Sequence, residues 1–254
     1  MFIGRPVTVR LTGAIPGGAE TFTWRASPGF GPVLLVLQQG GDGASVSQWL
    51  DAGDASEPFP LTVVTPEKGF VAVLVLYLGL GFTHIVPKGL DHILFVLGLF
   101  LLSTKLRPLL WQVTAFTVAH SVTLAMSMLG LLSLPPSVVE PLIALSIAWV
   151  AFENIVTSEL KPWRPLVVFC FGLLHGLGFA SVLVDLGMPR GHFVTALVGF
   201  NVGVELGQLA VIGFALAGVG WYWKARWYRP WVVIPVSGAI AAVGLYWAVE
   251  RTLL

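Results

Sequence analysis

The chain has 254 residues, of which 56% are hydrophobic and 11% charged, and its formal net charge is +1. A soluble domain carries about 25% charged residues, so this composition excludes a water-exposed globule and predicts lipid as the solvent for most of the chain. The balanced charge gives no reason to expect a nucleic-acid partner. The only cysteine, Cys170, excludes an internal disulfide and a site of several thiolates. Any bound metal must therefore have nitrogen and oxygen ligands.

Residues 1–68 are predicted to form a small β-rich unit outside the cytoplasm. The runs RPVTVRLTG, ETFTWRA and PVLLVLQQ are rich in strand formers and are separated by glycine and proline clusters, and QQGGDGAS is typical of a hairpin loop. About four short strands make a thin sheet. The unit is therefore either small and complete or the end of a larger, truncated sandwich. The opening residues lack the apolar core of a signal peptide.

Residues 69–254 are predicted to form a transmembrane helical bundle. The apolar segments are 70–84, 90–104, 109–132, 137–158, 165–187, 193–219 and 231–250. Several reach the roughly 20 residues that a membrane-spanning helix needs. The first two are shorter, and Pro87 and Gly89 break the chain between them. We expect six spans preceded by an interfacial or re-entrant helix at 70–84, with seven spans as the alternative.

Basic residues predict the orientation of the bundle. The loops TKLRP, KPWRP and WYWKARWYRP together hold seven lysines and arginines, whereas the alternate loops SLPPS and GMPRGHF hold one. The positive-inside rule places the first set in the cytoplasm. The helix at 90–104 then begins outside. We expect a multi-pass protein of the bacterial inner membrane, with the N-terminal unit outside and the lipid bilayer as its partner.

Ionisable residues within membrane spans indicate a functional site, because a charge there is costly. The segment 193–219 has one polar face, formed by Asn201, Glu205 and Gln208. Three glycines at i, i+4 and i+8 lie on the opposite side: Gly199, Gly203 and Gly207. Glu205 is expected near the middle of its span, where pure structure explains a carboxylate poorly.

Two histidines lie in the other long segments. His120 shares a helix face with Thr117 and Ser121, and it is either a ligand or a packing residue that bonds a neighbouring helix. His175 lies between Gly172 and Gly176, a pair that allows a second helix to approach closely. In segment 137–158, Glu153 and Asn154 are further polar candidates, although Glu153 is also close enough to the helix end to reach water.

These residues form a predicted metal site with a supporting network. The candidate ligands are His84, Asp91, His92, His120, His175 and Glu205. The supporting polar residues are Ser121, Glu153, Asn154, Asn201 and Gln208. Imidazoles and carboxylates suit Ni²⁺, Co²⁺ or Zn²⁺ and also suit a proton relay. Asp91 has a structural explanation as well, since it starts a helix and can cap free N–H groups there.

The stretch GFTHIVPKGLDHILFVLGLFLL resembles the signature of the HupE/UreJ family, proposed nickel and cobalt permeases: a His, a short gap, Gly-x-Asp-His and an apolar helix. FTVAHSVTLA, FENI, FGLLHGLGFA and FNVGVELGQ are similar to the branch with an extra N-terminal extracytoplasmic region. The resemblance covers about residues 70–220 and implies that the Asp-His motif begins the first span on the outer side. Six residues separate His84 from Asp91, one more than is usual in the family, and no Glu follows His175-Gly176 as in the better-characterised permeases.

Three functions are compatible with this pattern. We expect a permease for divalent transition metal ions, in which His84, Asp91 and His92 collect the ion outside. A second site for the ion within the bundle would consist of His120, His175 and Glu205. No ATP-binding GxxxxGK[ST] motif is present, so transport would be passive or coupled to a gradient. The alternatives are an intramembrane zinc hydrolase assisted by Ser121 or Glu153, and an assembly or scaffold protein whose polar faces pack helices.

Overall fold

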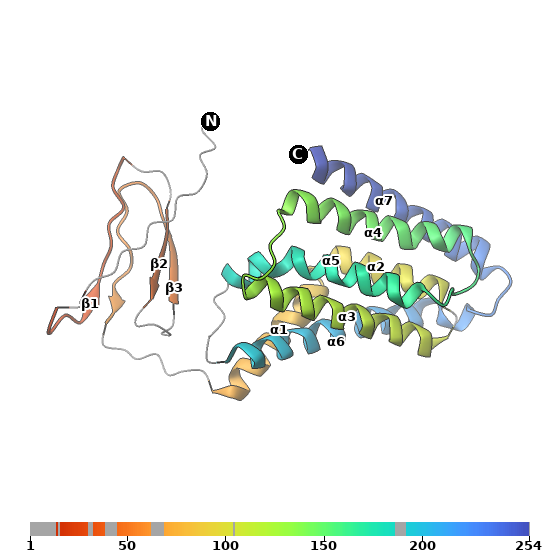
Figure 1. Cartoon of the computed structure of the whole chain (residues 1–254), viewed down its shortest axis with the longest axis horizontal. Coiled ribbons are helices and arrows are strands. Elements are labelled where there is room, and N and C mark those ends of the chain that lie inside the picture. The colour runs from red at the N-terminus through yellow and green to blue at the C-terminus, as the bar shows by residue number, and fades with distance from the viewer. Residues whose placement is uncertain are drawn as a thin grey trace. The chain divides into compact units, whose positions relative to one another are not determined.

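The computed structural model describes residues 14, 16–29, 33–38, 45–61, 69–103, 105–185 and 192–253. The chain divides into two compact units, Met1–Glu67 and Lys68–Leu254 (Figure 1). The first unit is β-rich and the second is helical. The strand predicted in RPVTVRLTG lies outside the described residues.

The N-terminal unit contains two small antiparallel sheets. Strands β2 (Val33–Gln38) and β3 (Ser45–Leu50) are antiparallel, as the predicted hairpin requires. Val33 pairs with Leu50 at one end of the ladder, and Gln38 pairs with Ser45 at the other. Strands β1 (Thr21–Phe22) and β4 (Phe59–Pro60) form the second pair.

The second unit is a bundle of long apolar helices, which confirms the predicted fold class of a helical polytopic membrane protein with a small β unit. The helices are α1 (Phe70–Ile85), α2 (Leu90–Leu102), α3 (Leu106–Met128), α4 (Pro136–Val156), α5 (Arg164–Asp185), α6 (Phe193–Val219) and α7 (Ile234–Leu253). Short 3-10 (Gly220–Tyr222) and π (Arg229–Val233) turns connect α6 to α7. Large apolar side chains on the outer surface, such as Phe214 at 75% exposure and Trp231 at 77%, fit a lipid environment.

Within the described residues, four helical stretches are long and apolar enough to cross a membrane: Leu106–Met128, Pro136–Val156, Phe193–Tyr222 and Arg229–Leu253. Helices α1 and α2 meet at an angle of 70° and together make one broken span or a re-entrant loop. The sequence placed a full span at 90–104, whereas α2 has only 13 residues. At 1.5 Å per residue, α2 is about 20 Å long, too short for a hydrocarbon core of about 30 Å.

Three helix pairs make the most extensive contacts in the bundle: α1 with α6, α3 with α5, and α4 with α7. Each pair is closed by glycines that let two backbones approach. A Cβ atom on Gly203 would meet Leu78 O of α1, one on Gly176 would meet His120 O of α3, and one on Gly244 would lie 2.9 Å from Ala148 N of α4. The predicted glycine face of α6 and the predicted close neighbour of His175 are thereby confirmed.

Candidate metal centre

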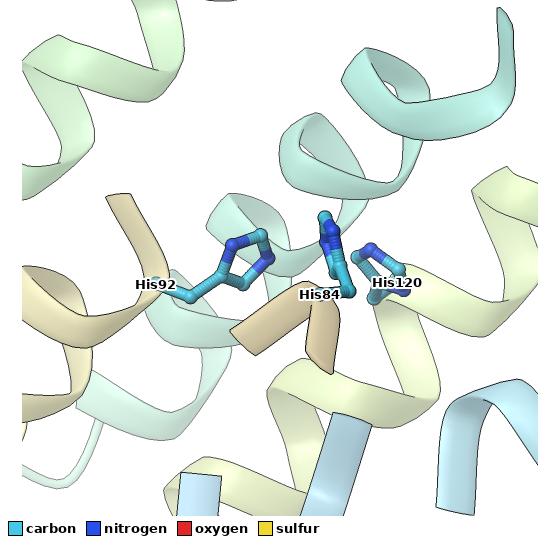
Figure 2. Close-up of side chains that lie close together, drawn as sticks. All are labelled: His84, His92 and His120. Carbon is cyan, nitrogen blue, oxygen red and sulfur yellow. The ribbon is translucent and has the colours of Figure 1, made fainter. Parts of the chain in front are cut away.

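Three imidazoles from three helices converge inside the bundle. His84 lies at the end of α1, His92 at the start of α2 and His120 in the second half of α3, and one ring nitrogen of each lies within 4.8 Å of the other two (Figure 2). Two nitrogen ligands of one ion lie no more than about 4.2 Å apart, since metal–nitrogen bonds are about 2.1 Å long. A side-chain adjustment of less than an ångström would bring all three onto one ion.

The broken pair of helices creates this convergence. His84 and His92 flank the turn at 86–89, where α1 ends and α2 begins. Gly89 is required in that turn, because a Cβ atom there would collide with the carbonyl oxygen of His84. The sequence placed the two histidines at the outer rim, apart from an inner site at His120. The structure instead brings all three into one cluster.

His175 of α5 completes the group from a fourth helix. Its ring centroid lies 5.0 Å from that of His92, and its side chain is 1% exposed. His175 Nδ1 lies 2.8 Å from Phe171 O. A carbonyl oxygen only accepts, so Nδ1 carries the proton and Nε2 keeps its lone pair. Four of the five histidines of the chain are therefore gathered in one place.

His120 is oriented in a similar way by a neighbour on α6. Asn201 Nδ2 donates to Leu197 O at 2.8 Å, which turns Asn201 Oδ1 toward His120 Nδ1 at 3.3 Å. The imidazole donates to this oxygen from Nδ1, and Nε2 again holds the lone pair. Metal-binding histidines are oriented by such second hydrogen bonds. Within the described part of the chain, Nε2 of His120, Nε2 of His175 and both ring nitrogens of His92 are buried without a hydrogen-bond partner.

Aromatic rings enclose the histidines. The rings of Phe116 and Phe200 stack on that of His120 with interplanar angles of 20° and 18°, and the ring of Phe95 lies 5.3 Å from that of His175. Rings of this kind keep the dielectric low. Uncharged imidazoles with free lone pairs are the forms that bind a metal ion.

A cavity of about 730 Å³ connects the cluster to the surface. His84, His92 and His175 line its inner part, and the exposed side chains of Lys88 and Glu140 line its mouth. A hydrated cation could enter the bundle here.

Asp91 lies in this cavity but is engaged in an ion pair. Its two carboxylate oxygens accept bonds of 3.1 Å from the two terminal nitrogens of Arg251 on α7. Asp91 lies in the first turn of α2, as predicted, but its predicted capping role is wrong, since the helix has no side-chain cap at its N-terminus. The carboxylate instead connects α2 to the last helix.

Glu205 does not join the histidine cluster. Thr114 Oγ1 donates to its carboxylate at 2.7 Å, and Thr117 Oγ1 donates to Gln208 Oε1 at 2.9 Å. With the contact between His120 and Asn201, these bonds form a polar ladder between α3 and α6. From His120 to Thr114 the ladder extends about 9 Å along α3. Ser121 bonds the backbone oxygen of Thr117 on α3 itself.

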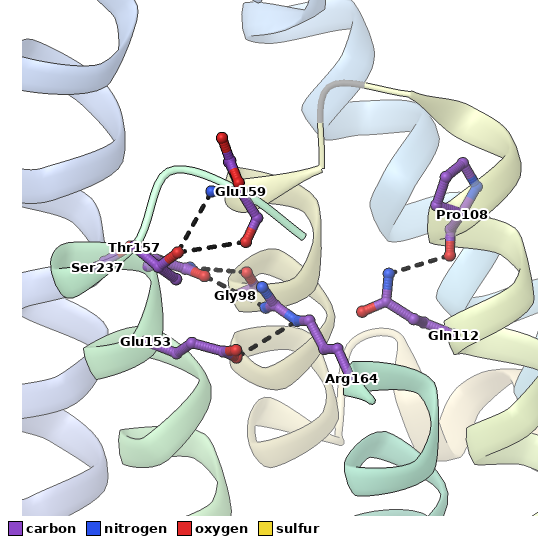
Figure 3. A network of polar contacts seen from close by, with 9 residues as sticks. Gly98, Pro108, Gln112, Glu153, Thr157, Glu159, Arg164 and Ser237 are labelled. Carbon is purple, nitrogen blue, oxygen red and sulfur yellow. Dashed lines mark hydrogen bonds and ion pairs between the residues drawn. The ribbon is translucent and has the colours of Figure 1, made fainter. Parts of the chain in front are cut away.

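The remaining predicted polar residues belong to a second network at another level of the bundle. Glu153 Oε2 lies 3.5 Å from Nε of the fully buried Arg164 (Figure 3). Arg164 Nη2 also donates a hydrogen bond to Asn154 Oδ1. Asn154 Nδ2 in turn donates to Gly98 O and to Ser237. Arg164 begins α5, so His175 lies about 16 Å further along that helix. Glu153 is thus placed away from the histidines.

The fold and the site define a polytopic helical membrane protein with a buried histidine cluster at a broken helix. A family model described as HupE / UreJ protein matches residues 62–251. The chain therefore belongs to the HupE/UreJ family, which is associated with nickel and cobalt transport. No curated protein and no solved structure gave a significant match.

Arg251 was missed by the sequence reasoning, although it lines the cavity. The sequence contained an indication of its role. Arg251 is a basic residue at the end of the last apolar segment. The positive-inside rule assigns this end to the outer side of the membrane, where basic residues are scarce. The threonines of the ladder gave a weaker signal, since hydroxyls are common in spanning helices.

Proposed function

We propose that this protein is a membrane permease for divalent transition metal ions of the nickel and cobalt class, with zinc as a further possible substrate. The observation that carries the proposal is the convergence of four histidines from four helices, three of which, His84, His92 and His175, line an open cavity. Neutral imidazoles replace the hydration shell of a borderline cation without adding charge to the membrane interior.

The architecture favours transport over permanent binding. Broken helices near the middle of a bundle are a common way for transporters to line a substrate site. The ladder of Asn201, Gln208 and Glu205 continues the polar environment beyond the histidines, and Glu205 supplies a negative charge along it. An ion that leaves the cluster would meet oxygen ligands there, which bind borderline cations less tightly.

The experiment is uptake of Ni²⁺ and Co²⁺ by proteoliposomes, with equilibrium binding measured on the same preparations. His92→Ala and His120→Ala should each lower affinity at least about tenfold, as loss of even the orienting partner of a ligand does, and should abolish uptake. The fifth histidine, His192, provides the matched control. It lies at the start of α6, and His192→Ala should behave as wild type. Equal uptake by all variants would refute the proposal.

The same preparations test the alternative of a zinc hydrolase. Tight stoichiometric Zn²⁺ in the purified protein, without transport in liposomes, would favour that alternative. Such an enzyme needs a group that transfers protons beside the metal. Of the two groups considered, Ser121 bonds a backbone oxygen and Glu153 pairs with Arg164.

The proposed orientation places the N-terminal unit outside the bacterial inner membrane. Five basic residues of the loops assigned to the cytoplasm are exposed: Lys105, Arg107, Lys161, Lys224 and Arg226. Their exposure in these loops supports the positive-inside assignment. Labelling of single cysteines introduced at Lys161 and Lys88 in a Cys170→Ser background should give opposite accessibility in intact cells, with position 88, at the mouth of the cavity, reached from outside.

A further inference from the structure

Arg251 forms an ion pair with the carboxylate of Asp91, beside the proposed metal cluster. The pair is bidentate, with both bonds at 3.1 Å, and the two side chains are 22% and 26% exposed. Bidentate arginine–carboxylate pairs are the more strongly held and geometrically specific kind of ion pair. An entering cation therefore meets Asp91 with its charge already neutralised.

We propose that Arg251 is a specificity-determining residue that withholds Asp91 from hard cations such as Ca²⁺ and Mg²⁺. This inference rests on the proposed function, because it concerns which ions reach the histidines. Hard cations are bound by oxygen ligands, above all carboxylates, whereas Ni²⁺, Co²⁺ and Zn²⁺ accept imidazole nitrogen. With Asp91 paired, the side chains that face an ion at the inner end of the cavity are the imidazoles of His84, His92 and His175, and imidazoles select against hard ions.

Arg251 is held in place by more than the carboxylate. Its guanidinium lies 5.1 Å from the Trp247 ring centre and 3.4 Å from Glu140 O. These contacts hold the guanidinium beside Asp91 in addition to its two bonds to the carboxylate. Asp91 is adjacent to His92 in the chain and lines the same cavity, so a cation bound to its carboxylate would lie close to the cluster.

Glu140 also lines the cavity, but it does not have the same role. Its side chain is exposed at the mouth, where water competes for any ion that it attracts. The half-buried Asp91 is the carboxylate that could form a hard-ion site together with the cavity.

The test compares wild type with Arg251→Gln in two measurements on purified full-length protein: direct binding of radioactive Ca²⁺, and Ni²⁺ binding with and without competing Ca²⁺ or Mg²⁺. A weak carboxylate site has a Kd for Ca²⁺ on the order of 1 mM. In Arg251→Gln, Ca²⁺ at about 10 mM should then weaken apparent Ni²⁺ affinity about tenfold. Wild type should change less than about twofold under the same conditions.

Three further variants separate specificity from structure. The exposed Arg226 provides the matched loss of charge, and Arg226→Gln should keep the wild-type ion profile. Arg251→Lys keeps the charge but not the paired bonds, so it should be intermediate. The double variant Asp91→Asn with Arg251→Gln should lose the new sensitivity to Ca²⁺, since the freed carboxylate is gone.

A merely structural clamp gives a different result. Arg251→Gln would then lower thermal stability without gaining Ca²⁺ binding or sensitivity, and the inference would be overturned. If wild type binds no transition metal, the proposed function fails, and direct Ca²⁺ binding by Arg251→Gln still decides whether Arg251 withholds Asp91. If Arg251→Gln does not fold, an unchanged ion profile in Arg251→Lys overturns the inference.

Discussion

Replacing Gly203 by Ala tests whether the close contact of α1 and α6 positions the metal cluster. A Cβ atom on Gly203 would collide with Leu78 O and would lie 2.8 Å from Phe82 N, where ordinary van der Waals contact begins at 3.4 Å. Both obstacles are backbone atoms of α1, which cannot rotate away as a side chain can. The two helices must therefore separate, and α1 carries His84 half a turn beyond Phe82.

The expected effect follows from this geometry. Overpacking of this kind costs about 1–3 kcal/mol, and a binding site must be held to within about 0.5 Å to keep its function. Gly203→Ala should therefore lower the midpoint of thermal unfolding by several degrees, at about 2–4 °C per kcal/mol for a chain of this size. It should also weaken Ni²⁺ binding, because His84 moves away from its two partners.

The control lies on the same helix. No atom lies within 4 Å of a Cβ on Gly213, so Gly213→Ala should gain roughly 0.5–1 kcal/mol from helix propensity and bind Ni²⁺ as wild type does. Thermal unfolding in detergent and titration calorimetry measure both quantities. Equal stability and equal affinity in the two variants would show that α1 and α6 are not held together as described.

Three other predictions concern the polar residues. Arg164→Ala should destabilise the protein by about 3–5 kcal/mol, because it leaves Glu153 buried without its partner, and the combined change with Glu153→Leu should recover part of that loss in the same unfolding assay. Ni²⁺ at about 100 times its Kd should raise stability by about 2.7 kcal/mol; a chelator should remove the gain, and His92→Ala, which binds at least about tenfold more weakly, should gain no more than about 1.4 kcal/mol at the same Ni²⁺ concentration. Glu205→Gln should lower the rate of Ni²⁺ uptake but leave equilibrium affinity within about threefold, since Glu205 bonds Thr114 rather than the cluster; an unchanged rate would exclude it from the route.

The sequence predicted those features of the fold that depend on local periodicity. The spacing of Gly199, Gly203 and Gly207 correctly predicted a face that packs closely, and Pro87 with Gly89 correctly predicted a break. Neither pattern indicates which helix packs against that face, because the two helices in contact are separated by more than a hundred residues in the sequence. The contact of Gly203 with α1 therefore required the structure.

The candidate site could be predicted only as a set of residue types. His84, His92, His120 and His175 were all proposed as ligands, and the structure brings these four together. Glu205 was expected beside them because it lies on a polar face of its helix. The position of a residue on a helix face does not predict which level of the neighbouring helix that residue contacts. Arg251 was missed because its partner is 160 residues away in the sequence.

The proposed ligands of the cluster belong to different closely packed helix pairs. His84 belongs to the pair of α1 and α6, His120 and His175 belong to the pair of α3 and α5, and Asp91 is tied through Arg251 to the pair of α4 and α7. A cation bound by His84 and His120 at the same time would cross-link two of these helix pairs. If transport requires the helix pairs to move relative to each other, the cation that stays bound to the histidines longest should be transported most slowly. A cation that binds very tightly should then inhibit transport.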